Sequence, residues 1–230
     1  MKNLSFAIFL AVAFFPMSTM AETNLLQGIF TEADKKWMVR VRAVYLSMSQ
    51  GSDPIPSLGV PKDAIEVEDI FIPELDISYF FTKHIAAELV LTYPQKHELH
   101  FQNSAIGPFK SGTFKHLPPT LTLQYHFFPD SWFRPYIGGG VNYTFFFDEK
   151  INVPGITPLR LETGSLGGAV QFGFDVKLSK IFANIPDGFF LNADLKKIWI
   201  NSKVKAFGSV QVSKLYPDPL VAGVGLGYRF

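Results

Sequence analysis

The chain of 230 residues contains no cysteine, which excludes a disulfide framework, thiol chemistry and a lipid anchor on cysteine. Beyond its first 21 residues it also lacks a run of about 18 apolar residues, the minimum length for a transmembrane helix. Neither sign of charge is in marked excess, because the chain has 21 basic and 20 acidic residues. Nucleic acid and strongly acidic partners are therefore not indicated.

The beginning of the chain has the pattern of an export signal. Lys2 supplies the positive end, an apolar stretch runs from Leu4 to Phe15, and small residues stand at Thr19 and Ala21. This pattern predicts a Sec signal peptide over 1–21, followed by a single domain over 22–230. Lys2 is the only charged residue of the predicted signal, so the remaining chain has a net charge near zero.

Aromatic residues and strict alternation are what the chain has in abundance. Aromatics make up 15% of the sequence, with 24 phenylalanines. The segment from Leu220 to Phe230 alternates between large apolar residues and a face of glycines that ends on Arg229. A strand of this length that ends on an aromatic is typical of the closing strand of an outer-membrane barrel. We expect the barrel-assembly machinery to engage this strand through Phe230.

Period-2 alternation predicts seven further strands. They are Trp37–Met48, Ile70–Phe81, His84–Tyr93, Leu117–Phe127, Phe133–Phe146, Leu166–Leu178 and Phe189–Ile200. Shorter connections alternate with long ones that are rich in Gly, Pro, Ser and Asn. The sequence therefore predicts an all-β fold, an eight-stranded antiparallel up-and-down transmembrane β-barrel with both termini in the periplasm.

The alternative fold is a soluble, lipocalin-like barrel, which would turn its apolar face inward and its charges outward. Alternation alone does not decide which face points outward. The terminal strand and the export signal favour the membrane barrel. We therefore expect the protein in the outer membrane of a Gram-negative cell envelope, with membrane lipid around it.

Three segments resemble a known family. They are His116–Thr120 (HLPPT), Phe133–Asp148 (FRPYIGGGVNYTFFFD) and Gly227–Phe230 (GYRF). With the eight-strand pattern, they make the predicted mature chain similar to the OmpW family of small outer-membrane proteins. The resemblance implies a narrow barrel that passes small hydrophobic molecules.

If Tyr228 and Phe230 face lipid, Arg229 faces the lumen, and the same parity assigns a face to every residue of each strand. Near the periplasmic ends the lumen face is charged. We expect its charged residues to form a paired ionic plug: Arg40, Arg42, Asp76, Glu88, Asp175, Asp194, Lys196 and Arg229. Lys197 falls on the lipid face, so it either extends to the interface or marks a bulge.

Toward the outer ends the lumen face becomes apolar. The predicted solute-contacting residues are Val44, Leu46, Met48, Ile72, Val90, Phe146 and Ile198. An eight-stranded barrel is only wide enough for side chains or one small ligand, which argues against a water-filled pore. Two interpretations stay open: a simply packed interior, or a hydrophobic funnel above the ionic plug.

Pro94 stands at the outer end of the third strand, where a proline removes a ladder hydrogen bond. Pro118 and Pro119 weaken the neighbouring strand at the same level. The resemblance implies a comparable proline that permits exit sideways into lipid, so we expect a lateral opening between strands three and four. The alternative is that Pro94 merely ends its strand.

Evidence for catalysis or metal binding in the sequence is weak. His97, Glu98 and His100 lie together in an outer segment, but two histidines at this spacing form at most a weak metal site. We predict a protein that is not an enzyme and needs no cofactor or metal. The other functional hypotheses are a surface-interaction barrel without transport, for example a receptor or adhesin, and a lipid-modifying enzyme that depends on a loop histidine.

Overall fold

The computed structural model describes residues 35–49, 51–55, 60–101, 109–151, 160–206 and 210–230. The predicted signal peptide, 1–21, lies outside these residues, so its prediction stays untested. Within the described residues, no helix is both long and apolar enough to span a membrane.

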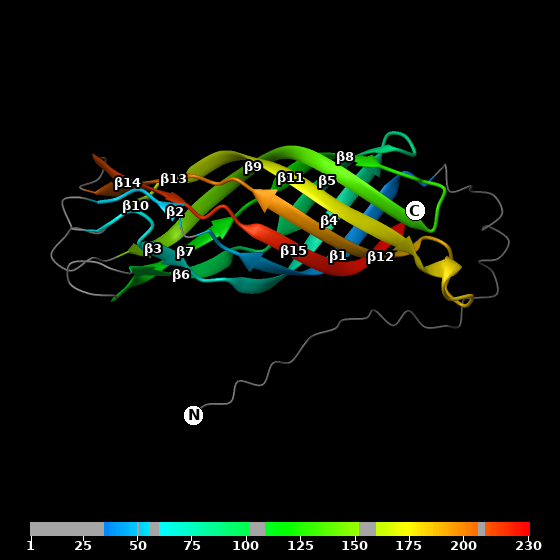
Figure 1. The fold of residues 1–230 in the computed structure, drawn as a ribbon, viewed down its shortest axis with the longest axis horizontal. Coiled ribbons are helices and arrows are strands. Elements are labelled where there is room, and N and C mark those ends of the chain that lie inside the picture. The colour runs from blue at the N-terminus through cyan, green and yellow to red at the C-terminus, as the bar shows by residue number, and fades with distance from the viewer. Residues whose placement is uncertain (1–34, 50, 56–59, 102–108, 152–159, 207–209) are drawn as a thin grey trace, which may run out of the picture. The chain divides into compact units, whose positions relative to one another are not determined.

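Eight long strands close into an antiparallel barrel (Figure 1). They are β1 (Trp37–Ser47), β4 (Ile70–Phe80), β5 (Ile85–Thr92), β8 (Thr120–His126), β9 (Phe133–Ile151), β11 (Gly164–Lys177), β12 (Phe189–Ile198) and β15 (Leu220–Arg229). The first strand pairs with the last, and β9 pairs with both β8 and β11, which completes the ring. The predicted fold is confirmed, and the strands begin and end within a few residues of the predicted bounds.

The long connections contain strands of their own, which the sequence pattern did not predict. They are β2 (Gly51–Ser52), β3 (Ile65–Val67), β6 (Gln95–Phe101), β7 (Phe109–Leu117), β10 (Arg160–Leu161), β13 (Ser202–Ala206) and β14 (Val210–Tyr216). In Figure 1 they gather at the end of the barrel opposite the C-terminus. The β6–β7 hairpin extends the barrel wall from β9, and β10, β13, β14 and β2 form a separate four-stranded sheet. Among the described residues, the connections at the other end of the barrel are 81–84, 127–132 and 178–188, and the last of them contains the 3₁₀ turn Leu178–Lys180.

The two faces of each barrel strand follow the predicted parity. Large apolar side chains point outward and are exposed, among them Val41, Leu123 and Phe172 at 56–59%. Aromatic pairs such as Trp37–Tyr79, with ring centroids 4.8 Å apart, lie at the periplasmic rim. An exposed apolar band with aromatic rims is the surface that lipid requires.

Lys197 lies on this outer face without any register shift in either neighbouring ladder. Its Nζ donates to the backbone carbonyl of Asp218 at 2.6 Å. The side chain therefore extends to the outer interface, and no bulge is present.

Candidate functional site

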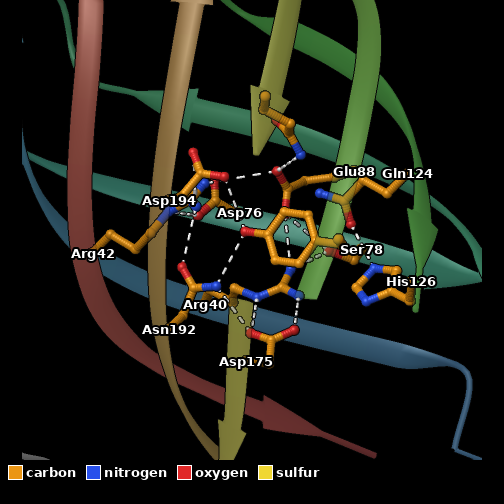
Figure 2. A network of polar contacts seen from close by, with 12 residues as sticks. Arg40, Arg42, Asp76, Ser78, Glu88, Gln124, His126, Asp175, Asn192 and Asp194 are labelled. Carbon is orange, nitrogen blue, oxygen red and sulfur yellow. Dashed lines mark hydrogen bonds and ion pairs between the residues drawn. The ribbon is translucent and has the colours of Figure 1, made fainter. Parts of the chain in front are cut away.

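Arg40 on β1 lies at the centre of a buried polar network in the lumen (Figure 2). Its Nε and Nη2 donate to the two carboxylate oxygens of Asp175 at 3.2 and 2.7 Å. Its Nη1 donates to Ser78 Oγ at 2.7 Å and to Glu88 Oε2 at 2.8 Å. The bidentate pair fixes the guanidinium plane, so this arginine joins strands on opposite sides of the barrel.

Arg42, two residues further along β1, points into the same lumen. Its Nε lies 2.7 Å from Asp76 Oδ2, its Nη2 2.9 Å from Glu74 Oε1, and its Nη1 3.3 Å from Asp194 Oδ1. Lys196 Nζ lies 3.8 Å from the same oxygens of Glu74 and Asp194. Each cation is thus shared between carboxylates, which spreads the cost of burying these charges.

Neutral side chains complete the network. Tyr136 Oη donates to Asp194 Oδ2 at 3.0 Å. Asn192 Nδ2 donates to Tyr136 Oη at 3.1 Å and to Asp175 Oδ1 at 2.9 Å. The sequence analysis did not single out Tyr136, although its lumen-facing parity could have found it.

The glycine face of β15 makes room for the two arginines. A Cβ at Gly225 would lie 2.7 Å from Arg42 Cα and would also meet the carbonyl oxygen of Val41. A Cβ at Gly227 would lie 3.1 Å from Arg40 Cγ. These glycines face β1 across the ladder, and only a missing side chain lets the arginine stems pass over β15.

We call the charged residues of this network the ionic plug. Its members are the cations Arg40, Arg42 and Lys196 and the carboxylates Glu74, Asp76, Glu88, Asp175 and Asp194. All are at most 6% exposed. Five carboxylates against three cations give the ionised plug a formal charge of −2.

One residue is added to the predicted plug: Glu74 belongs to it, and the alternation through Asp76 could have shown this. Arg229 lies toward the periplasmic end of the lumen, where its Nε donates to the carbonyl of Lys35 at 2.8 Å and its guanidinium carbon lies 3.8 Å from the centre of the Phe80 ring. Its part in the plug stays a prediction.

The extracellular half of the lumen is filled by one apolar cluster. It includes the predicted Val44, Leu46, Met48, Ile72, Phe146 and Ile198. Val90 is also buried, at 3% exposed, but lies outside this cluster. The structure therefore brings most of the predicted apolar lumen residues together above the ionic plug.

The strands of the extracellular connections supply much of this cluster. Phe114 from β7, Val204 from β13 and Leu215 from β14 are each at most 4% exposed. The sequence analysis treated these segments as loops. The short alternation around Val204 and Ala206 is the signal that could have found them.

The wall of the barrel is interrupted beside the apolar cluster. The β4–β5 ladder ends at Glu74 and Thr92, and the β3–β6 ladder resumes at Val67 and Leu99 in the same register. Six consecutive residues on each side lie between these pairs without a ladder. At about 3.3 Å per residue the interruption is roughly 20 Å long.

We call this interruption the lateral seam; it consists of Glu68–Pro73 opposite Tyr93–Glu98. The seam holds a proline on each side, Pro73 and Pro94, and neither has an N–H to donate. His97 Nδ1 forms a 3.0 Å hydrogen bond across it to the carbonyl of Glu68. A side chain thus makes the link that a ladder would make elsewhere.

The ladder on the other side of Pro94 is also broken, over a shorter distance. Leu91–Pro94 stands opposite Leu117–Pro119, four residues against three. Asn142 Nδ2 on β9 donates to the carbonyls of Pro118 and Pro119 at 3.2 and 3.3 Å. The two prolines are thereby tied to β9, and the longer interruption is the one between the start of β4 and β6.

The histidines of the outer hairpin do not form the cluster that their sequence spacing suggested. His97 and His116 point inward and are buried, whereas His100 Nε2 lies 3.7 Å from Glu98 Oε2 on the exposed face. Burial lowers the pKa of His116 to about 3 and lowers the pKa of His97. In the part of the chain that the structure covers, no three His, Cys, Asp or Glu side chains group as metal ligands.

A closed antiparallel barrel with an exposed apolar band, aromatic rims and a buried polar network defines an outer-membrane β-barrel protein. A family model described as the OmpW family matches residues 36–230. The chain belongs to the OmpW family. Proteins of this family are not known as enzymes.

Known proteins agree with this assignment. The chain is 38% identical over 199 residues to the uncharacterized outer-membrane protein y4mB of Sinorhizobium fredii, covering 84% of this chain and 80% of the relative. It is 35% identical over 164 residues to outer membrane protein W of Vibrio cholerae, covering 68% and 72%. The crystal structure of outer membrane protein OprG from Pseudomonas aeruginosa superposes with a TM-score of 0.65 at 28% identity, covering 85% of this chain and 96% of OprG. The protein is thus located in the outer membrane.

Proposed function

We propose that the protein is a narrow transporter for small hydrophobic molecules, which enter its lumen from outside and leave sideways into the membrane. The observation that carries this proposal is the position of the lateral seam beside an apolar lumen that is closed below. Ile72 belongs to both the seam and the apolar cluster, while Phe71 next to it is 76% exposed on the lipid side.

The ionic plug supports a sideways route. An apolar solute that passed it would have to separate Arg40 and Arg42 from their carboxylates. Stranding a buried charge costs about 3–5 kcal/mol, and the solute offers no hydrogen bond in return. The direct path into the periplasm is therefore the costlier one.

The seam lowers the cost of the alternative path. Opening a laddered pair of strands breaks a backbone hydrogen bond about every second residue on each strand. Between Glu68–Pro73 and Tyr93–Glu98 that ladder is missing, and the link from His97 to Glu68 is a single side-chain hydrogen bond. The wall is weakest where the apolar lumen meets lipid.

Entry from outside requires movement of the extracellular strands. Val204 on β13 and Leu215 on β14 close over the apolar cluster, and both are nearly fully buried. On the outer side of this cap Lys203 and Lys205 of β13 pair with Glu162 at 3.5 and 3.6 Å, whereas its inner side contacts the cluster through apolar side chains. We infer that a solute displaces the cap and takes its place on the same apolar surface.

The direct test is the uptake of a small apolar dye by cells that make matched amounts of folded protein. Wild type is expected to speed uptake, and Leu46→Asp is expected to abolish it because a charge then stands in the apolar lumen. If wild type has no effect with several solutes, the transport proposal fails and the surface-interaction barrel becomes the better hypothesis.

The exit route is tested with engineered disulfides, which are unambiguous because the chain has no cysteine. A Pro73→Cys, Tyr93→Cys pair spans the seam at the position next to its last ladder pair. The control is Leu75→Cys, Leu91→Cys, a directly paired position inside the intact ladder. Oxidation should stop uptake only in the seam variant, and a reductant should restore it. Equal uptake before and after oxidation of the seam pair would rule out the lateral exit.

Catalysis receives no support from the outer histidines. His97 and His100 point to opposite faces of β6, so they do not converge on one reacting group. The hypothesis of a lipid-modifying enzyme predicts that a loop histidine is indispensable. Unchanged uptake by the His100→Ala variant would contradict that prediction for His100.

A further inference from the structure

The outward side of the extracellular four-stranded sheet carries basic side chains that stand directly opposite one another. In the ladders of this sheet, Arg160 on β10 pairs with Lys205 on β13, and Lys203 on β13 pairs with Lys214 on β14. Paired residues have their side chains on the same face, with Cβ atoms about 4.5–5.5 Å apart, and like charges in such a pair are destabilising. We call Arg160, Lys203, Lys205 and Lys214 the cationic face.

One carboxylate serves two members of the cationic face. Glu162 lies 3.5 Å from Lys203 Nζ and 3.6 Å from Lys205 Nζ, measured to its two carboxylate oxygens. Among the residues that the structure describes, neither Arg160 nor Lys214 has an ion-pair partner. Each pair of opposed cations thus contains one member whose charge is not balanced by an ion pair.

The acidic residue at the edge of this sheet is Asp53. Its N–H donates to the carbonyl of Lys214 at 2.9 Å, and its carboxylate accepts a 3.5 Å hydrogen bond from Tyr216 Oη. The connecting segments 152–159 and 207–209 contain no charged residue in the sequence. Four cations with Glu162 and Asp53 give this side of the sheet a formal charge of +2.

The cationic face continues the lipid-facing wall of the barrel toward the outside (Figure 1). The parity that places Leu195 and Trp199 outward, at 46% and 45% exposed, continues without a change to Lys203. The parity that places Leu220 outward likewise continues to Lys214. Tryptophan is typical of the membrane interface, and four extended residues span about 13 Å. A lipid whose chains lie on the apolar band therefore has its headgroup beside these cations.

We propose that the cationic face binds the phosphorylated sugar headgroup of a glycolipid in the outer leaflet. Phosphate oxygens accept charge-assisted hydrogen bonds from Lys and Arg, and a phosphate placed between opposed cations removes their repulsion. A zwitterionic phospholipid would bring a cation of its own to a surface that is already positive. The position beside the apolar band favours a membrane lipid over a soluble anion.

This inference does not rest on the transport proposal, because the cationic face points away from the lumen. On the same two strands, Val204 and Leu215 point inward and contribute to the apolar cluster. A headgroup bound between Lys203 and Lys214 would hold β13 and β14 together from outside. The glycolipid would thus stabilise the extracellular sheet without entering the barrel.

The test uses the full-length barrel refolded in detergent micelles, with purified lipid A as the added probe. Native mass spectrometry during a titration measures the occupancy. Wild type is expected to bind lipid A saturably, and added salt should weaken binding because it screens exposed charges. Lys203→Gln and Lys214→Gln should each weaken the affinity by about fivefold, the effect typical of one basic residue at an anionic lipid surface.

The matched control is Lys96→Gln in the other extracellular hairpin. Lys96 is also exposed and stands directly opposite a lysine, Lys115, but Asp148 lies 2.6 Å from Lys115 Nζ and balances its charge. This variant should bind lipid A as wild type does. Lipid A without its phosphates should bind wild type at least about fivefold more weakly.

Thermal unfolding provides a readout with opposite signs. In phosphatidylcholine vesicles, Lys214→Gln should keep or raise the unfolding midpoint, because its repulsion with Lys203 is gone. In vesicles that also contain lipid A, the midpoint of wild type should rise more than that of the variant. A merely structural role of Lys214 would lower the midpoint of the variant in both kinds of vesicle.

Four results would overturn the proposal. They are an absence of saturable lipid A binding by folded wild type, equal binding of lipid A without phosphates, a loss with Lys96→Gln as large as with Lys203→Gln, and displacement of lipid A by an equal concentration of soluble glucosamine phosphate. The third would indicate a general effect of charge, and the fourth a site for soluble anions. The heat-dependent gel shift of a folded barrel checks that each variant has folded.

Discussion

The two halves of the lumen are equally buried, yet different forces hold them shut. In the periplasmic half, Arg40 and Arg42 form ion pairs of fixed geometry with carboxylates on β4, β5, β11 and β12. In the extracellular half, apolar side chains from β1, β7, β9, β13 and β14 pack together. Loss of one charge leaves its partners buried and unpaired, whereas an apolar cluster loses stability in proportion to what is removed.

The barrel wall is continuous around the periplasmic half of the lumen and interrupted beside the extracellular half. At the level of the ionic plug, Arg40 pairs in the ladder with both Gly227 and Asp76, and Asp76 pairs with Val90. At the level of the apolar cluster, the lateral seam interrupts the ladder. Under the proposed function, we therefore expect the lower half to stay fixed and the upper half to rearrange around a solute.

The largest expected effect comes from breaking the ionic plug. Arg40→Met removes the guanidinium and leaves Glu88 and Asp175 buried without their cation. We expect the free energy of unfolding in phospholipid vesicles to fall by about 3–5 kcal/mol. A urea titration followed by tryptophan fluorescence measures it, and adding Glu88→Gln and Asp175→Asn should recover part of the loss.

The control for this prediction is the exposed ion pair of Lys115 and Asp148, with 2.6 Å between nitrogen and oxygen. Lys115→Ala should cost at most about 1 kcal/mol, because water replaces the lost partner. Equal losses for Arg40→Met and Lys115→Ala would show that burial does not distinguish the two pairs.

A smaller effect is expected from the glycine face that admits the arginines. Gly225→Ala places a methyl group 2.7 Å from Arg42 Cα, and the resulting shift should cost about 1–3 kcal/mol. Gly139→Ala is the matched control, because a Cβ there would lie 3.8 Å from the carbonyl oxygen of Ala169, an ordinary contact. The control should stay within about 0.5 kcal/mol of wild type. The same urea titration compares them, and a larger loss at Gly139 than at Gly225 would contradict this account.

The smallest effect is expected in the apolar half. Ile198→Val removes one methylene from the cluster and should cost about 0.5–1.5 kcal/mol. Dye uptake should persist, because the lumen surface stays apolar. A loss of stability as large as that of Arg40→Met would mean that the upper half is as rigid as the plug.

Much of the fold and of the ionic plug could be predicted because a barrel strand has only two faces. Once Tyr228 is assigned to lipid, parity assigns Arg40, Arg42 and Asp76 to the lumen without any knowledge of their partners. The balance between burial and charge then requires that they pair. The same rule reaches Glu74, which the sequence analysis passed over.

Parity could not predict which residues of the β6–β7 hairpin face the lumen, because the parity of the inward residues changes between β5 and β6. Inward residues are even-numbered on β5 up to Val90 and odd-numbered on β6 from Gln95, so His97 faces the lumen and His100 faces outward. The change occurs inside the interrupted wall, where no ladder keeps the two strands in phase. Neither the burial of His97 nor its stacking on His116 follows from local spacing.

The number of barrel strands, their sidedness and the charged and apolar zones of the lumen were determined by the sequence itself, because they depend on a repeat of two residues within each strand. The tertiary structure decided the partners of Arg40, the position of the lateral seam between β4 and β6, and the stacking of His97 on His116. Each of these depends on register between strands that are distant in sequence. Period-2 alternation is local, and it contains no information about which residue of one strand stands opposite which residue of another.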